Sequence, residues 1–356
     1  MDDFTDIVEA NWYSNFGPFE QRFREGIADY LGTAAETVVT VNNATTGLMA
    51  ALAALLPRGN GSESIAIASF TFAAGAQAII WHGYRPAWID IDEETLQPSL
   101  TSLRELSATN PGLRAILFTN TFGIGAPDID AWESEAADLG VPLIVDSAAG
   151  FGSRYPDGAL LGARGDCEVF SFHATKPFAI GEGGAVVCKD PAVATSARQF
   201  TNFGFSSSEG AAGVGLNGKL QELNAAIGLR QLKTFETDLE SRRAIFDQYV
   251  AAFAALPLRF PPGSRESSLC FASAVLDMPL APALLDALVE ASIDGRSYYS
   301  PALHLQPWFA GFLPTLSLRV TERIVPRLVS LPILPGMSAE EVRRVITTVA
   351  GALRAE

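Results

Sequence analysis

The chain is poor in basic residues, with 25 lysines and arginines against 40 aspartates and glutamates in 356 residues, a net charge of −15. Nucleic acids and anionic membrane surfaces are bound by clustered cations that release counterions, so this balance argues against both as partners. Any anionic ligand must be held by a few local groups. The sequence also lacks an apolar run of membrane-spanning length, and its N-terminus lacks the basic start and apolar stretch of a signal peptide.

Cysteine is scarce as well. Cys167, Cys188 and Cys270 are too few and too scattered for a disulfide framework or a zinc site, so no metal site is expected and we interpret the three as small core residues. This usage is typical of a reducing compartment and predicts a cytoplasmic protein. The 48% hydrophobic content at this length predicts a large core in one or two domains.

What the chain does have is an alternation of β-branched apolar segments with helical patterns, which predicts an α/β sheet. Seven strands are expected, at 37–41, 64–68, 85–90, 113–118, 142–146, 168–172 and 185–188. The first helix is expected to begin at Pro18 and to bury one face, formed by Phe19, Phe23, Ile27 and Tyr30.

The second half of the chain carries two helical signals. A long helical pattern begins near Leu220 and is followed by a proline-bearing stretch at 257–265, so we place a domain boundary near Ile245. The expected domains are 1–245 and 246–356. Ser338 and Glu341 form a capping-box pattern, which predicts an amphipathic terminal helix.

Lys176 is the most informative residue of the sequence. It closes the run SFHATK that begins at Ser171, and it lies 176 − 146 = 30 residues after Asp146, which ends an apolar strand. Pyridoxal phosphate chemistry requires such a pair, because a lysine amine condenses with the cofactor aldehyde while a carboxylate keeps the pyridine nitrogen protonated. Ser171 can bind the cofactor phosphate. Taken alone, Lys176 is more typical of a solvated loop lysine and Asp146 of a helix cap, but the two do not stand alone.

Three further motifs suit the same cofactor. Thr45 and Thr46 stand where a strand runs into an alanine-rich helix, which is a ready anion site or an ordinary N-cap. Phe72 follows another strand, where an aromatic ring can stack on a planar cofactor or simply belong to the core. The glycines of 181–184 allow a tight reversal near Lys176.

Together these motifs resemble one family. The segments NATT (43–46), SFTF (69–72), SFHATK (171–176), GEGG (181–184) and NGKLQELNAA (217–226), with Asp146, look like the DegT/DnrJ family of sugar aminotransferases, which are fold-type I pyridoxal phosphate enzymes. The resemblance runs from about Asn11 to the terminal helix. It implies a large domain with a mixed, mostly parallel seven-stranded sheet and a smaller C-terminal α/β domain.

The resemblance also implies roles for individual residues. Lys176 would hold the cofactor and then move the proton between the substrate carbon and the cofactor C4′, while Asp146 would pair with the pyridinium nitrogen. Phe72 would stack on the ring. The cofactor phosphate would be bound by Thr45, Thr46 and Ser171.

Four more positions match family segments near the phosphate or the substrate. Asn217 matches a residue that reaches the phosphate across a dimer interface, which implies a homodimer with shared active sites. Lys219 stands where the family has a basic residue, and Tyr13 lies in a segment, 12–18, that resembles the family's N-terminal segment near the substrate. His304 lies in a segment that resembles one near the sugar site. We take Lys219, Tyr13 and His304 as candidates for substrate binding.

One position departs from the family pattern. The family has Gln or His three residues after the aspartate, where this chain has Ala149. Alanine has no side-chain group that can hydrogen-bond the cofactor's 3′-oxygen, so that contact must come from another group or from water.

The resemblance implies an aminotransferase that moves an amino group from glutamate to a nucleotide-linked keto-sugar. The His-Ala-Thr-Lys form of the lysine motif resembles members acting at the sugar C4 position more than at C3. A sugar dehydratase relative is an alternative, but its pattern replaces the lysine with histidine. The other alternative is a non-catalytic regulatory or binding protein on the same scaffold, because fold does not fix function.

Overall fold

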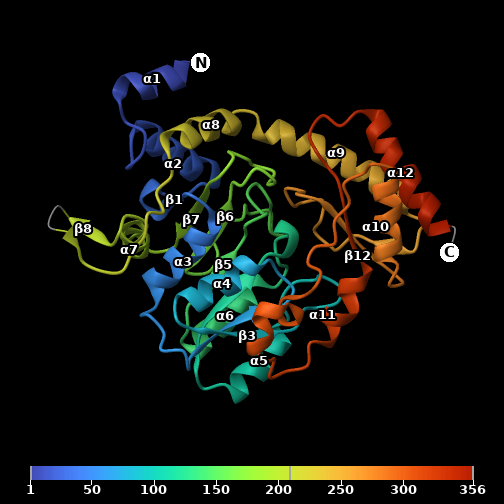
Figure 1. Ribbon diagram of the computed structural model, residues 1–356, viewed down its shortest axis with the longest axis horizontal. Helices are drawn as coiled ribbons and strands as arrows, with labels where there is room; N and C mark the ends of the chain where they lie inside the picture. The colour runs from blue at the N-terminus through green and yellow to red at the C-terminus, as the bar shows by residue number, and fades with distance from the viewer. Residues whose placement is uncertain (1, 208–209, 355–356) are drawn as a thin grey trace.

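A seven-stranded sheet forms the centre of the molecule, in the order β1-β7-β6-β5-β4-β2-β3 (Figure 1). The computed structural model describes residues 2–207 and 210–354. The five neighbouring strands β2 to β6 all run parallel to one another. β7 runs antiparallel to both β1 and β6. All seven predicted strands are confirmed, with ends that differ by at most one residue: β1 (Val38–Val41), β2 (Ser64–Ala68), β3 (Arg85–Ile89), β4 (Leu113–Thr119), β5 (Leu143–Asp146), β6 (Cys167–Ser171) and β7 (Gly184–Cys188).

Helices cover both faces of this sheet, because side chains of successive strand residues point to opposite faces and both sets are apolar. One face packs against α2 (Pro18–Leu31), α5 (Leu100–Thr109), α6 (Ile129–Leu139) and α8 (Glu222–Leu232). The other face packs against α3 (Ala44–Leu55), α4 (Ala73–Trp81) and α7 (Pro191–Thr201). The predicted apolar face of α2 is confirmed, with Phe19, Phe23 and Ile27 buried.

Two helix predictions need correction. A helix, α1 (Asp2–Ala10), precedes α2, which the sequence pattern had as the first helix. The long helix expected from Leu220 is two helices, α8 and α9 (Phe235–Phe253), separated at residues 233–234. The physical reason is that α8 packs on the large sheet through α2, whereas the second half of α9 packs on a different core.

That different core belongs to the C-terminal part of the chain, and its hydrophobic cluster begins at Ile245 and ends at Leu353. It forms between α9, α10 (Ala281–Glu290), α12 (Ala339–Arg354) and an antiparallel sheet of β10 (Leu258–Arg259), β11 (Ala272–Leu276) and β12 (Leu328–Leu331). The capping box ahead of α12 is confirmed, because the Ser338 N–H donates to Glu341 Oε2 at 2.7 Å and the Glu341 N–H donates to Ser338 Oγ at 3.3 Å. Residues 1 and 355–356, at the ends of the two expected domains, lie outside the described residues.

The remaining elements are short. They are the hairpin of β8 (Phe205–Ser207) and β9 (Gly210–Ala211), the helix α11 (Arg319–Ile324), and the 3₁₀ turns η1 (Ala35–Thr37), η2 (Thr121–Gly123), η3 (Leu303–Leu305), η4 (Pro307–Gly311) and η5 (Val325–Arg327). Among residues 2–207 and 210–354, no helix is both long and apolar enough to cross a membrane.

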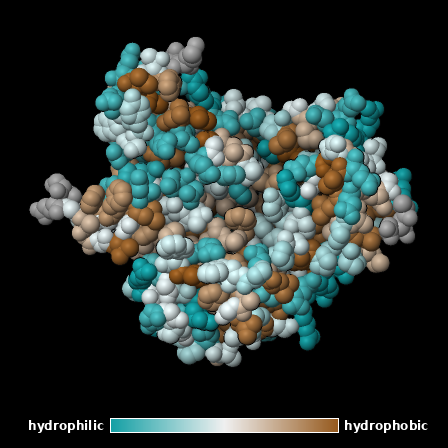
Figure 2. Space-filling model, viewed as in Figure 1, coloured by the Kyte–Doolittle hydropathy of each residue, from teal (hydrophilic) through white to brown (hydrophobic). Residues whose placement is uncertain are grey.

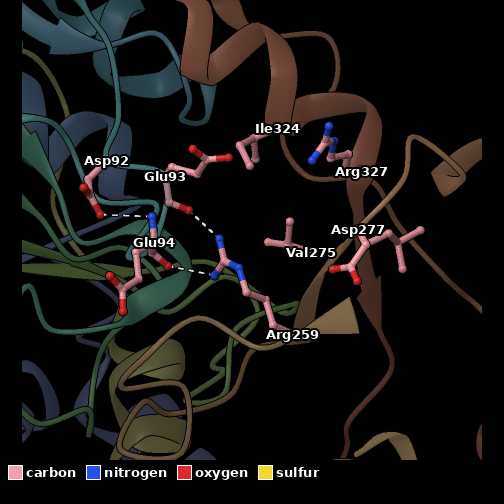
Figure 3. A pocket seen from close by; sticks show the side chains of 9 residues that line it. Asp92, Glu93, Glu94, Arg259, Val275, Asp277, Ile324 and Arg327 are labelled. Atoms are coloured by element: carbon pink, nitrogen blue, oxygen red, sulfur yellow. Dashed lines mark hydrogen bonds between the residues drawn. The ribbon is translucent and has the colours of Figure 1, made fainter. Parts of the chain in front are cut away.

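Polar contacts join the C-terminal part to the loop that follows β3. The buried carboxylate of Asp90 accepts hydrogen bonds from the Val320 N–H at 2.9 Å and the Thr321 N–H at 2.8 Å, so it caps the start of α11. From β10, Arg259 donates to the carbonyl oxygens of Glu93 and Glu94 across a pocket of about 490 Å³ (Figure 3). None of the residues that line this pocket is a predicted site residue.

The N-terminus of α2 is held by a buried carboxylate from α8. Glu222 accepts hydrogen bonds from the Phe19 N–H at 2.8 Å and the Glu20 N–H at 2.9 Å, which lack intrahelical partners because they lie in the first turn of α2. Gly17 makes room for this carboxylate, since a Cβ there would lie 2.6 Å from Glu222 Cδ. The Glu222 N–H in turn donates to the Tyr13 carbonyl at 3.0 Å, which ties the N-terminal segment to the same point.

We expect Glu222→Gln to lower the free energy of unfolding by roughly 2 kcal/mol, because one acceptor oxygen becomes an amide that faces a buried N–H donor. Urea unfolding measures the loss, with the exposed Glu240→Gln on α9 as the matched control. Equal stabilities of the two variants would contradict the capping role.

Candidate active site

The candidate site lies at the edge of the sheet where the parallel strands end. Asp146 is the last residue of β5, and Ser171 is the last residue of the neighbouring β6. Lys176 follows in the loop between β6 and β7. In open α/β sheets this carboxyl edge is where ligands bind, so the sequence pair lies at the expected place.

Asp146 presents one free oxygen in a buried position. Its Oδ1 accepts a hydrogen bond from the Ala148 N–H at 3.1 Å, whereas its Oδ2 accepts none from any residue that the structure describes. Burial raises the pKa of Asp146 to about 6, while the Ala148 hydrogen bond and the charge of Lys176 act to lower it. Lys176 is therefore close enough to act on this carboxylate, and Oδ2 is available to a cationic N–H donor.

The amine of Lys176 is also available. It is half-buried and makes no hydrogen bond or ion pair with residues 2–207 or 210–354. The loop that carries it is fixed by backbone contacts: the Lys176 N–H donates to the His173 carbonyl at 2.8 Å, and the Ala174 N–H donates to the Gly181 carbonyl at 2.8 Å. Gly181 has φ +89°, which a glycine adopts without strain, so the predicted tight reversal is confirmed.

A buried polar network, which the sequence did not reveal, lies next to Asp146. Ser147 donates from Oγ to Glu168 Oε1 at 2.5 Å and accepts from Asn120 Nδ2 at 2.8 Å. Tyr155 and two backbone N–H groups also donate to Glu168. Burial raises the pKa of Glu168 to about 7 against the lowering effect of these donors. The network fixes the backbone that directly follows Asp146.

The start of α3 forms an anion cradle beside Ser171. Asn43 Oδ1 accepts from the Thr46 N–H at 2.9 Å, so an ordinary N-cap is present, but the Ala44 and Thr45 N–H groups still lack intrahelical partners. Gly184 pairs with Ser171 across β6 and β7, and a Cβ on Gly184 would lie 3.1 Å from the Ala44 nitrogen. The fold therefore brings the threonines and Ser171 to one place.

Phe72 is 62% exposed at the residue before α4, so the alternative that it belongs to the core is wrong. It follows β2, whose carboxyl end lies on the same edge of the sheet as that of β5. An exposed ring at this edge has a free face on which a planar cofactor can stack.

The segment that carries Asn217 and Lys219 lies against the cradle. A Cβ on Gly218 would lie 2.5 Å from Thr46 Cγ2, and the Gly218 carbonyl accepts from the Asn42 N–H at 2.8 Å. Lys219 is buried, donates to Asn217 Oδ1 at 2.8 Å, and has its pKa lowered by burial. The Asn217 residue itself is exposed.

The other two substrate candidates, Tyr13 and His304, differ in solvent exposure. Tyr13 is exposed, in the segment between α1 and α2. His304 has a side chain only 4% exposed, with Nδ1 at 2.5 Å from Ser69 Oγ and Nε2 at 3.3 Å from Glu322 Oε1. Both nitrogens of the His304 ring therefore contact protein groups, and the ring links the end of β2 to α11.

Sequence reasoning missed two residues near the pair. Cys270 is half-buried with Sγ at 3.4 Å from the Thr175 carbonyl, so its interpretation as a core residue is wrong. Burial raises the pKa of Cys270, and the charge of Lys176 acts to lower it. Burial also raises the pKa of Tyr299, with a further contribution from the charge of Asp146. Both residues come from the C-terminal half. Tyr299 belongs to the segment 298–304 that also carries His304 and is expected near the sugar site, whereas no local motif marks Cys270.

The residues present fit pyridoxal phosphate. The fit rests on an unpaired lysine amine, a buried carboxylate oxygen without a donor, and free N–H groups at the start of α3. These match the aldehyde, the pyridinium nitrogen and the phosphate of that cofactor.

Comparison with known proteins agrees. The model of the DegT/DnrJ/EryC1/StrS aminotransferase family matches residues 1–350. Protein Rv3402c of Mycobacterium tuberculosis is 44% identical over 353 residues, which cover 98% of this chain and 85% of that protein. The dTDP-4-amino-4,6-dideoxy-D-glucose transaminase of Shigella dysenteriae is 28% identical over 98% of this chain and 95% of its own length.

Among solved structures, DesI in the presence of its TDP-sugar product superposes with a TM-score of 0.90 at 30% identity, covering 99% of this chain and 90% of that chain. The fold is therefore that of fold-type I pyridoxal phosphate-dependent aminotransferases. The chain belongs to the DegT/DnrJ/EryC1/StrS aminotransferase family and is a pyridoxal phosphate-dependent enzyme of the sugar aminotransferase type.

Proposed function

We propose that this enzyme moves an amino group from glutamate to the C4 carbon of a nucleotide-linked keto-sugar. The observation that carries the proposal is that a Lys176 amine without a bonding partner acts by its charge on the buried residue Asp146, whose Oδ2 accepts no hydrogen bond from the described residues. The nucleotide sugar is supported by two relatives, the Shigella transaminase named for a dTDP-linked amino sugar and DesI solved with a TDP-sugar product. The C4 position rests on the His-Ala-Thr-Lys form of the lysine motif, and the glutamate donor rests on the family resemblance as a whole.

Two residues carry the chemistry in this proposal. Pyridoxal phosphate, when bound, supplies an electron sink for the carbanion that forms at the substrate carbon. Asp146 keeps the pyridine nitrogen protonated through Oδ2, because a buried carboxylate with few donors strongly favours a cation beside it. Lys176 holds the cofactor covalently and, once displaced by the substrate amine, moves a proton between the substrate carbon and the cofactor C4′.

The other site residues position the cofactor and the substrate. Thr45, Thr46 and Ser171 bind the phosphate with hydroxyl and backbone N–H groups, and Phe72 stacks on the ring. On the substrate side we assign three residues, Tyr13, Lys219 and His304. The chain as a whole is strongly acidic and would repel an anionic substrate, so a local positive charge must attract it. We assign this role to the buried Lys219.

We also propose the two domains expected from the sequence, 1–245 and 246–356. The separate hydrophobic cluster that begins at Ile245 supports this boundary within α9. The cytoplasmic location stays a prediction.

We further propose that the enzyme is a homodimer in which Asn217 reaches the phosphate of the partner subunit. Large apolar and aromatic side chains are exposed on α1 and in the segment after it: Phe4, Val8, Trp12 and Tyr13. Figure 2 shows hydrophobic residues on the surface around α1. A monomer would leave this apolar surface in water. The exposed position of Asn217 is compatible with a contact to a second copy.

Lys176→Ala should reduce transamination by at least about a thousandfold, because both the covalent link and the proton shuttle are lost while the fold remains. Turnover is measured beside exposed Lys189→Ala, which should keep full activity. Borohydride reduction of the loaded protein followed by peptide mass spectrometry should label Lys176 in the wild type. Near-normal turnover of Lys176→Ala, or a label on another lysine, would refute the assignment.

Asp146→Asn should keep the covalent link to the cofactor but slow both half-reactions by roughly a hundredfold or more, because the pyridine nitrogen loses its charged partner. Stopped-flow absorbance measures each half-reaction, and Asp286→Asn on the exposed face of α10 is the matched control. Unchanged half-reaction rates in Asp146→Asn would count against this role.

Mixing Lys176→Ala subunits with Asn217→Asp subunits should restore activity if sites are shared, because a mixed dimer has one site with both lesions and one with neither. After random exchange, about one quarter of the wild-type activity is expected. A mixture no more active than its parents, once exchange is confirmed, would argue against shared sites, as would full activity in a monomer at low concentration.

A further inference from the structure

Two cysteines that are distant from the cofactor pair meet across neighbouring strands. Cys167 is the first residue of β6 and Cys188 is the last residue of β7, and the two are direct partners in the antiparallel register. Their Sγ atoms lie 3.3 Å apart, and the residues are 1% and 2% exposed. β6 and β7 run side by side at the centre of the molecule (Figure 1).

The backbone at this pair already suits a disulfide. The Lys189 N–H donates to the Asp166 carbonyl at 3.0 Å, so the hydrogen bonds flank the two cysteines and leave them as a non-hydrogen-bonded pair. Such pairs have Cα atoms about 4.5 Å apart, within the span of about 4.4 to 6.8 Å that a disulfide bridges. Only side-chain rotation is needed to bring the sulfur atoms from contact to bonding distance.

We propose that Cys167 and Cys188 form a dithiol site that hydrogen peroxide converts to a disulfide. In the first step a thiolate attacks one peroxide oxygen, the O–O bond breaks, and water leaves after protonation, which gives a sulfenic acid. In the second step the other thiol attacks the sulfenic sulfur, the S–O bond breaks, and a second water leaves. Two thiols and one peroxide thus give one disulfide and two waters, with sulfur oxidised and peroxide reduced.

The environment determines which oxidant can react. The pair is enclosed in the core between the sheet and the helices α3 and α7, so a small neutral oxidant suits it better than a bulky disulfide. Burial and the hydrogen bond to Cys188 raise the pKa of the Cys167 thiol, so the reaction is slow. Once one sulfur is oxidised, the second is already in contact, which favours the disulfide over further oxidation.

The consequence concerns the strands that carry the active-site loop. β6 ends at Ser171, β7 begins at Gly184, and the loop between them carries Lys176. The bond would close a loop of 188 − 167 = 21 residues at the far end of this hairpin. The disulfide would therefore link β6 to β7 at one end. Ser171, four residues further along β6, would not have to move. The expected effect is greater thermal stability of the oxidised protein rather than loss of the site.

The test treats the full-length protein with excess hydrogen peroxide and samples it over many hours, far beyond the time in which free cysteine in a parallel vessel is fully oxidised. Each sample is denatured in an alkylating reagent and its peptides are mapped by mass spectrometry. We expect Cys167 and Cys188 in one linked pair that lacks two hydrogens, and a midpoint of thermal unfolding raised by about 5 °C. Cys270→Ser should behave in the same way. Cys167→Ser should show neither the link nor the shift.

Alkylation of both Cys167 and Cys188 after this treatment would overturn the proposal, as would sulfinic acid at either residue or a link that involves Cys270. A link without a rise in the unfolding midpoint would overturn its structural consequence. If Cys167→Ser fails to fold, Cys188→Ala serves as the second control, and the peptide map of the wild type decides the matter on its own. No step of this test depends on the bound cofactor.

Discussion

The site depends on one constraint: the Asp146 carboxylate and the Lys176 amine lie near each other, and neither group is fully used in hydrogen bonds to other residues. The Asp146 Oδ2 atom and the Lys176 amine each lack a hydrogen-bond partner among the described residues, although the charge of Lys176 acts to lower the pKa of Asp146. A buried carboxylate in this state costs free energy, which the raised pKa of Asp146 expresses. Parallel strands make the arrangement possible, because β5 and β6 end side by side and their side chains meet at one edge of the sheet.

The elements around this pair restrict its geometry. On one side the Glu168 network fixes the backbone after Asp146, and on the other the turn at Gly181 fixes the loop of Lys176. Residues of the C-terminal part also contact this edge of the sheet. Ser268 Oγ donates to the Ala149 carbonyl at 2.7 Å, and His304 contacts Ser69 just after β2. Interactions that join the two halves of the chain therefore lie beside the candidate site residues.

The sequence predicted the central sheet well because five of its strands, β1, β2, β5, β6 and β7, are short runs buried on both faces, which leaves a clear local signal. It missed α1, and it merged α8 with α9, because local periodicity does not tell which core a helical segment will join. The Asp146 and Lys176 pair was predictable from spacing and motif. The position of Cys270 was not, because only the tertiary fold brings it to the site, and the segment that holds Tyr299 was expected near the sugar site without a role for Tyr299 itself. The contact of Cys167 with Cys188 escaped prediction for the same reason, since it depends on the register of β6 and β7.

The most direct test of the account is the half-reaction in isolation. Protein loaded with pyridoxal phosphate is mixed with L-glutamate, and in parallel with the other common amino acids, without any sugar, while cofactor absorbance and oxoacid release are recorded. The account predicts that one amino acid, glutamate by our proposal, discharges the absorbance of the bound cofactor and releases one oxoacid per active site. An absorbance that no amino acid changes, in protein whose Lys176 is shown to be bound to the cofactor, would contradict the assignment of this site to amino-group transfer.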